Sequence, residues 1–127
     1  MRPKSTETDL STCEKPIMKV IWGWDKDIAV QELIVQMRVQ FEKDYARTTV
    51  VTFLKKLSDK GYVKTYRVGN AAFVKPVITE ENYQKMLVKK ECNFWFDGKP
   101  SKMLSALLQS PDIPEEEVQA MRDMLKA

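Results

Sequence analysis

The residues of this sequence best suited to chemistry are threonines that stand among basic side chains shortly before its midpoint. If their segment is a helix, Thr48, Thr49 and Thr52 lie opposite an apolar stripe. A threonine hydroxyl can bond base edges or phosphates, and its methyl group can pack on a thymine methyl. Lysine and arginine neutralise DNA phosphates and release counterions. These residue types predict a helix that reads DNA.

A lysine-rich helix face is ordinarily solvated surface, so this prediction needs a second observation. Three threonines on one exposed face are unexpected from propensity, because β-branched residues are mediocre helix formers. Residues 43–75 hold eight basic and two acidic side chains, whereas residues 77–127 hold seven basic and nine acidic ones. A basic block followed by a mildly acidic one predicts polyanion contact by the first part of the chain only.

Enzymatic and metal chemistry have little support in the composition. The sequence contains no histidine, which removes the commonest general base and the commonest metal ligand. Cys13 and Cys92 are far apart and in no ligand spacing, so we expect free thiols on small buried side chains. No paired carboxylates, phosphate-binding loop or nucleophile–base pair stands out. We predict a protein that is not an enzyme and uses no metal or cofactor.

The elements that must position the threonines have patterns of their own. Ser11 and Glu14 have the spacing of a capping box, and apolar residues at helical spacing follow as far as Trp22. A short strand is expected at 28–30. The apolar stripe after it predicts a second helix that ends near Phe41.

The threonine-bearing segment is the third of these helices, from Ala46 to Lys60, with Gly61 as its C-cap. Two strand-like runs follow at 62–67 and 72–74, joined by a Gly-Asn turn. Three helices and a hairpin are the order of a winged helix-turn-helix, whose helix before the hairpin enters the major groove. The predicted DNA-binding residues are Arg47, Thr48, Thr49, Thr52, Lys55, Lys56, Lys64 and Arg67.

The remainder predicts three further helices, at about 79–96, 101–108 and from 114 onwards, separated by Gly and Pro breaks. Their apolar residues, Trp95 among them, are too many for so small a tail to hide alone. Burial against a second copy in a two-fold dimer solves this; folding back on the winged helix in a monomer is the alternative. The predicted dimerisation residues are Met86, Leu87, Phe94, Phe96, Met103, Leu104, Leu107, Leu108, Val118, Met121 and Leu125.

The expected fold is therefore mainly α with a small β-hairpin. A flexible N-terminal arm is predicted at 1–9, a winged-helix DNA-binding domain at 10–77 and a helical dimerisation domain at 78–127. No apolar run approaches the roughly 18–20 residues of a membrane span, and the N-terminus lacks the pattern of a signal peptide. We expect a cytoplasmic protein that does not bind membranes.

Several motifs together resemble the penicillinase-repressor family of winged-helix regulators, the BlaI, MecI and CopY type. One is Leu10-Ser-Thr-Cys-Glu14 with the apolar helix that follows it. Another runs from Tyr45 to Leu57 and on to Gly61, and a third is Asp97-Gly98 before the helix at 101–108. The resemblance covers about residues 9–127.

This resemblance implies a homodimer whose winged helix binds one half of a pseudo-palindromic operator and whose C-terminal helices entwine with the partner. Members repress genes for β-lactam resistance or, in a related branch, for copper handling. Many are paired with a membrane sensor-protease that cleaves the repressor in its C-terminal region. On the matching positions, Thr48, Thr49 and Thr52 would lie in the major groove, flanked by Arg47 and Lys56.

Two departures from the family limit what the resemblance implies. The wing tip, Gly69 to Ala71, lacks the basic residue common there. The Asn-Phe pair at which members are cleaved would fall near Ser105-Ala106 and is absent there; Asn93-Phe94 lies in the preceding predicted helix. The residues thus predict a homodimeric DNA-binding repressor but name neither its genes, its operator nor its signal. The alternative is a winged-helix module that binds an acidic protein in a larger complex.

Overall fold

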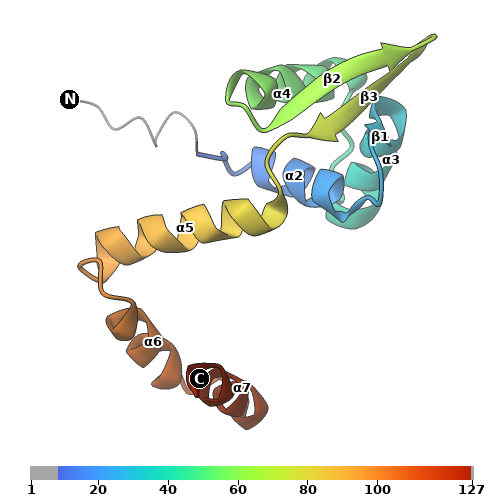
Figure 1. Ribbon diagram of the computed structural model, residues 1–127. Coiled ribbons are helices and arrows are strands. Elements are labelled where there is room, and N and C mark those ends of the chain that lie inside the picture. Colours follow the sequence, from blue (N-terminus) through green and yellow to red (C-terminus); the bar gives the residue numbers. More distant parts are fainter. Residues whose placement is uncertain (1–8, 127) are drawn as a thin grey trace. The chain divides into compact units, whose positions relative to one another are not determined.

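The computed structural model describes residues 9–126, which form six helices and one three-stranded antiparallel sheet (Figure 1). The described chain divides into two compact units, the first ending at Asn82 and the second beginning at Tyr83. The predicted mainly α fold, a winged helix followed by a helical C-terminal region, is confirmed. Most of the predicted arm lies outside the described residues. Its last residue, Asp9, is held, because its carbonyl accepts a hydrogen bond from Lys60 Nζ at 2.7 Å.

Helix α2 spans Glu14–Gly23 and buries Ile17, Met18 and Ile21. The predicted capping box forms in the turn before it. The Ser11 amide donates to Glu14 Oε1 at 2.8 Å, and the Glu14 amide donates to Ser11 Oγ at 3.2 Å. These two reciprocal bonds are those of a capping box, and the Glu14 amide also donates to the Ser11 carbonyl at 3.1 Å.

Strand β1 (Ile28–Ala29) leads directly into helix α3 (Val30–Phe41), as the apolar stripe predicted. Leu33 and Met37 are fully buried on the inner face of α3. The helix ends at Glu42, which adopts the left-handed conformation with φ 56°. Its amide closes the last turn by donating to the Arg38 carbonyl at 3.1 Å.

Helix α4 spans Arg47–Asp59, one residue shorter at each end than predicted. Val50, Leu54 and Leu57 are buried, and together with the inner faces of α2 and α3 they form the core of the first unit. Gly61, with φ 88°, follows the helix in the left-handed region, where glycine carries no Cβ penalty.

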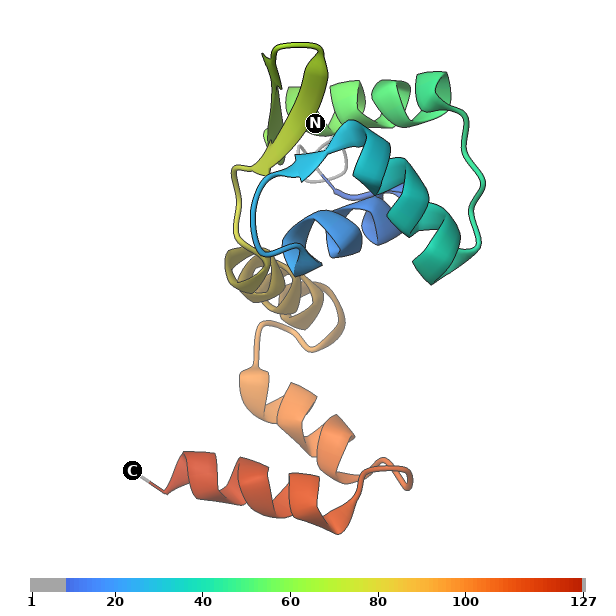
Figure 2. The same cartoon turned by 90° about the vertical axis from the view of Figure 1, so that its right-hand side faces the viewer.

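The sheet has the order β1-β3-β2 and is built around the hairpin of β2 (Val63–Val68) and β3 (Ala71–Pro76). The register pairs Val63 with Pro76 and Val68 with Ala71. Both views show the hairpin beside α4, and α4 contacts β2 (Figures 1 and 2). This hairpin is the wing of the winged helix.

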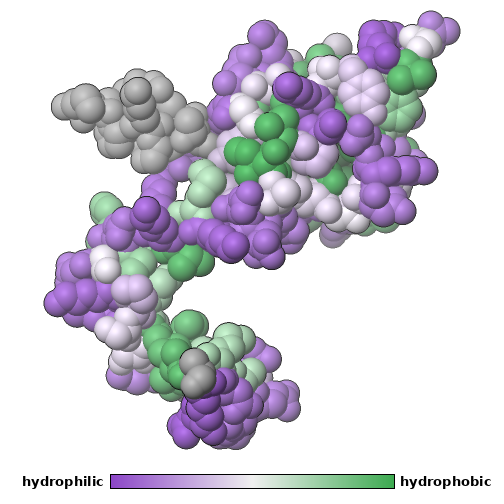
Figure 3. All heavy atoms as spheres, viewed as in Figure 1, coloured by the Kyte–Doolittle hydropathy of each residue, from purple (hydrophilic) through white to green (hydrophobic). Residues whose placement is uncertain are grey.

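The second unit holds most of α5 (Glu80–Trp95) together with α6 (Pro100–Leu108) and α7 (Glu115–Leu125). Thr79 Oγ1 caps α5 by accepting the Asn82 amide at 3.1 Å. Among the described residues of this unit, Cys92 alone is buried. Apolar residues of all three helices are open to solvent, and Figure 3 shows apolar patches on this unit. None of the described helices is long and apolar enough to cross a membrane.

Candidate nucleic-acid interface

The outer face of α4 carries most of the residues predicted to bind DNA. Arg47, Thr48 and Thr52 are exposed, as are both lysines of the next turn, Lys55 and Lys56. This face lies opposite the buried stripe of the helix, as the 3.6-residue period requires. Thr49 is half-buried and lies at the edge of the exposed face. Thr48 and Thr52 are therefore better placed than Thr49 to reach a base edge.

The hydroxyl of Thr52 has already used its donor. Thr52 Oγ1 donates to the Thr48 carbonyl at 2.9 Å, one turn back along α4. A threonine hydroxyl has one proton but two lone pairs. Thr52 can consequently offer DNA an acceptor and a methyl group, which suit an adenine or cytosine amino group and a thymine methyl, respectively.

Lys60, the last residue of the predicted helix, does not lie with the exposed basic side chains of α4. Its ammonium lies 2.7 Å from Glu14 Oε1, and the side chains are 21% and 2% exposed, respectively. Burial alone would raise the pKa of Glu14. The hydrogen bond and charge of Lys60, with the hydrogen bonds from Ser11, outweigh burial and lower the pKa below its ordinary value. Lys60 is thus a structural cation that ties the end of α4 to the start of α2.

The wing divides its predicted contacts between two faces. Cross-strand partners share a face, so Arg67 with Ala72 and Thr65 with Val74 lie on the side that meets α4. The pairs Lys64–Lys75 and Tyr66–Phe73 occupy the opposite face. Of the two wing residues predicted to bind DNA, the structure brings Arg67 to α4 and turns Lys64 away from it.

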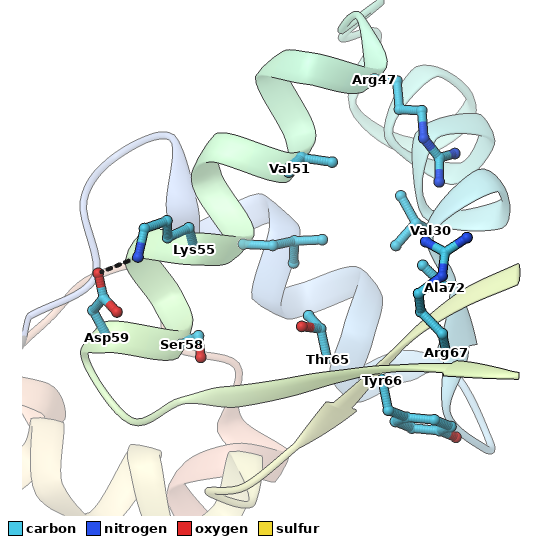
Figure 4. A pocket seen from close by; sticks show the side chains of 11 residues that line it. Val30, Arg47, Val51, Lys55, Ser58, Asp59, Thr65, Tyr66, Arg67 and Ala72 are labelled. Carbon is cyan, nitrogen blue, oxygen red and sulfur yellow. Dashed lines mark ion pairs between the residues drawn. The ribbon is translucent and has the colours of Figure 1, made fainter.

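A hollow of about 570 Å³ separates α4 from the inner face of the wing; we call it the α4–wing groove (Figure 4). The Arg47 and Arg67 side chains lie at one end, and the Lys55–Asp59 ion pair, 3.6 Å between Nζ and Oδ2, lies at the other. The residues that line the groove are Val30, Arg47, Val51, Leu54, Lys55, Ser58, Asp59, Thr65, Tyr66, Arg67 and Ala72. Tyr66 belongs to this set although its ring is directed away from α4 (Figure 4).

The start of α4 is anchored by Tyr45. Its ring packs on Phe53 with centroids 5.5 Å apart. Burial and the neighbouring Cys13, which hydrogen-bonds the hydroxyl, raise the Tyr45 pKa. Both cysteines are free thiols, as predicted; Cys92 is buried, but the expectation that Cys13 is also buried was wrong, because it lies in the exposed turn before α2.

The outer face of the wing is fixed to the body of the first unit. Tyr66 stacks on Phe73 with centroids 5.6 Å apart, and its hydroxyl donates to Asp27 Oδ2 at 2.6 Å. That hydrogen bond, with desolvation and the charge of Asp27, raises the Tyr66 pKa. Tyr66 and Phe73 are hairpin-face aromatics, and Tyr62 is a core residue at 2% exposure.

The described residues 9–82 therefore have the architecture of a winged helix, with threonines and basic side chains on the exposed face of its third helix. A family model described as Penicillinase repressor matches residues 10–127. The chain belongs to the penicillinase repressor family. The family resemblance read from the motifs is thereby confirmed, and the family is one of transcriptional repressors rather than enzymes.

Relatives within the penicillinase repressor family match almost the whole chain. The Penicillinase repressor of Staphylococcus aureus is 24% identical over 119 residues, which is 94% of this chain and 92% of the relative. Proteins named Methicillin resistance regulatory protein MecI, from Staphylococcus aureus strain N315 and Staphylococcus epidermidis, are 20% identical over 117 residues. That match covers 92% of this chain and 93% of each relative.

The predicted dimerisation residues lie on all three helices of the second unit, except Phe96, which directly follows α5. Those that are exposed are Met86, Leu87, Phe94, Leu107, Leu108 and Leu125. Those that are half-buried are Phe96, Met103, Leu104, Val118 and Met121. Exposed apolar residues of this unit that the prediction left out are Val88, Trp95 and Met124, at 52%, 68% and 78%.

Sequence reasoning also missed the walls of the α4–wing groove. Val51 stands one helical turn after Arg47, so the helical period could have placed both on one edge of α4. Thr65 shares strand parity with Arg67 and with buried Val63. The alternation along β2 could therefore have separated Arg67 from Lys64 before the structure was known.

Proposed function

We propose that the chain is a homodimeric transcriptional repressor that binds a pseudo-palindromic DNA operator. Each winged helix inserts α4 into the major groove of one half-site. Thr48 and Thr52 face base edges, while Arg47, Lys55 and Lys56 contact phosphates on either side. Arg67 reaches the backbone from the inner face of the wing.

The observation that carries the DNA-binding part is the composition of the exposed face of α4. Its basic side chains stand beside two threonines on the helix that a winged helix presents to DNA. Lys55 pairs with Asp59, and that ion pair is open to solvent. Arg47 and Lys56 pair with no carboxylate of the described residues. These cations are available to replace counterions on the DNA backbone.

The homodimer is supported by what the second unit leaves uncovered. Phe94 and Trp95 meet edge to face with centroids 4.7 Å apart, yet they are 73% and 68% exposed. Large aromatic side chains are costly to leave in water, and they dominate the energetics of protein interfaces. A two-fold partner that brings the same surface would bury them in a self-complementary contact.

The proposal is tested with purified chain and DNA from its own promoter region. Fluorescence anisotropy measures binding to that fragment and to a shuffled fragment of equal length, across a salt titration. We expect tighter binding to the promoter fragment at near-physiological salt. The bound sequence should contain two related halves about one helical turn apart. Sedimentation equilibrium should give twice the chain mass.

Equal affinity for promoter and shuffled DNA, vanishing near physiological salt, would contradict the repressor proposal. It would favour the winged-helix module that binds an acidic protein. If the promoter fragment is not the operator, selection of bound DNA from a random pool still separates the two, since a repressor enriches a palindromic sequence and a module enriches none.

A further inference from the structure

The α4–wing groove has a chemistry that DNA binding alone does not require. Its apolar lining comes from three elements: Val51 and Leu54 of α4, Val30 of α3 and Ala72 of β3. Ser58 and Thr65 add hydroxyl groups. A volume of about 570 Å³ lies in the range of small-molecule sites, which combine apolar walls with a few polar groups.

Two guanidinium groups converge at one end of this groove. Figure 4 shows the Arg47 and Arg67 side chains directed towards one another from α4 and β2. Within the part of the chain that the structure describes, neither guanidinium has an ion pair with a carboxylate. Arg67 spends one donor on the Asn70 carbonyl, at 3.1 Å, and the Asp59 carboxylate lies with Lys55 at the far end.

Like charges that converge without a counter-charge repel one another, and an anion between them removes the repulsion. Arginine binds carboxylates and phosphates through paired N–H donors in a planar fork. The apolar wall beside the two forks would cover a compact hydrocarbon body attached to such a group. Charge and wall together therefore favour an organic anion over a bare inorganic one.

We propose that the α4–wing groove is a binding site for a small organic anion, held by Arg47 and Arg67 through its carboxylate or phosphate and by Val30, Val51 and Ala72 through its apolar body. The binding itself does not depend on the function proposed above. One consequence rests on that function: a bound anion occupies Arg47 and Arg67 and so competes with operator DNA.

Such competition would release a repressor without cutting its chain. It suits a member of the family that has Ser105-Ala106 within α6 where the Asn-Phe cleavage pair would fall. The ligand would act as an inducer at the DNA-binding surface itself.

Phenyl phosphate is the probe for the test, followed by NMR chemical-shift changes of the backbone amides of the full chain. We expect saturable shifts at Val51, Lys55, Thr65 and Arg67, with inorganic phosphate binding at least about tenfold more weakly because it lacks an apolar body. Arg47→Gln and Arg67→Gln should each weaken phenyl phosphate about tenfold, since each removes a charge-assisted hydrogen bond. Arg38→Gln makes the same charge change at an exposed position of α3 and should leave phenyl phosphate binding unchanged.

A second variant guards against misfolding as an explanation. Val51→Glu places a carboxylate at the mouth of the groove, where Val51 is 48% exposed. It should fold, show a dispersed spectrum and lose phenyl phosphate binding. Equal binding of phenyl phosphate and inorganic phosphate would overturn the organic-anion site. The two arginines would then act only as contacts to DNA phosphates. Shifts scattered over the surface, or an equal loss in Arg38→Gln, would overturn any built site.

The competition arm uses the promoter fragment. Phenyl phosphate should raise the apparent dissociation constant of the wild-type chain for DNA by a factor that increases linearly with its concentration, as expected of a competitor. The Arg38→Gln chain should respond alike. If the chain binds no specific DNA while the NMR arm succeeds, the repressor function fails and the anion site stands. If DNA binds specifically and phenyl phosphate does not bind, the anion site fails and the repressor function stands.

Discussion

Among single residues, Lys60 is a lysine that stabilises the fold rather than facing solvent. Its charge neutralises the buried carboxylate of Glu14 across 46 positions of sequence. Lys60→Met should destabilise the first unit by about 3 kcal/mol, because removing one partner leaves a buried charge unpaired. Lys55→Met breaks the exposed pair with Asp59 and should cost less than about 1 kcal/mol. Urea unfolding of both variants measures the difference, and equal losses would contradict a structural role for Lys60.

Glu14 also makes a pH prediction. Its folded pKa is lowered, so the stabilisation it contributes is complete above its unfolded pKa, about 4.3, and is lost as the pH falls through the folded value. Glu14→Gln should therefore be less stable than the wild type at pH 7. The gap should narrow below about pH 4, where the wild-type carboxyl becomes protonated. Urea midpoints between pH 3 and pH 7 test this; a gap that stays constant to pH 3 would count against it.

Thr52 carries the sharpest prediction about base readout. Thr52→Ala should weaken binding to the operator by about 1–3 kcal/mol and binding to random DNA very little. Because its proton is engaged by Thr48, Thr52→Val keeps the methyl group and loses the acceptor, while Thr52→Ser does the reverse. Anisotropy titrations of the three variants identify which group reads the base. Exposed Thr12→Ala is the matched control, and equal losses on operator and random DNA would sink base readout by Thr52.

At the scale of elements, the wing acts through one face. Arg67→Gln should lower the magnitude of the slope of log affinity against log salt by about one unit per half-site, because one phosphate contact is lost. Lys64→Gln makes the same charge change on the face turned away from α4 and should leave the slope unaltered. Salt titrations on the promoter fragment compare the two. A larger effect of Lys64→Gln would mean that DNA approaches the wing from its outer face.

The elements that sequence predicted well are those whose patterns are local. The apolar stripe predicted the bounds of α3, and Gly61 marked the end of α4. The order of the helices and strands predicted the winged helix. What sequence could not give depends on tertiary contact. The Lys60–Glu14 pair and the Thr52 hydroxyl bond need coordinates, because helical periodicity assigns a face but no partner. The exposure of Cys13 is equally a product of the turn that places it.

For the whole molecule, the two units differ in what they bury. The first encloses a core of aliphatic side chains from α2, α3, α4 and the sheet. In the described part of the second, apolar residues recur on more than one side of α5. Leu87 and Phe94 lie two turns apart on one side, while Val88 and Trp95 lie on another. A helix with two apolar sides needs two partners, which α6 or α7 and a second chain could together supply.

This arrangement predicts that dimerisation and operator binding fail together. Leu87→Ser with Phe94→Ser removes each contact twice per dimer, because a two-fold interface repeats every residue. At about 2 kcal/mol or more for each central apolar anchor, the pair should turn the dimer into a monomer at micromolar concentration in sedimentation equilibrium. Operator affinity should fall towards that of one half-site while the winged helix keeps its fold.

Val39→Ser is the matched control for this loss. Val39 is 66% exposed on α3 of the first unit, so its replacement removes exposed apolar surface without touching the second unit. It should leave both mass and operator affinity unchanged. If the double variant stayed dimeric, the two-fold contact would have to lie on the Val88 and Trp95 side of α5. The same pair of substitutions made there would then decide which side of the helix meets its own chain and which meets the second copy.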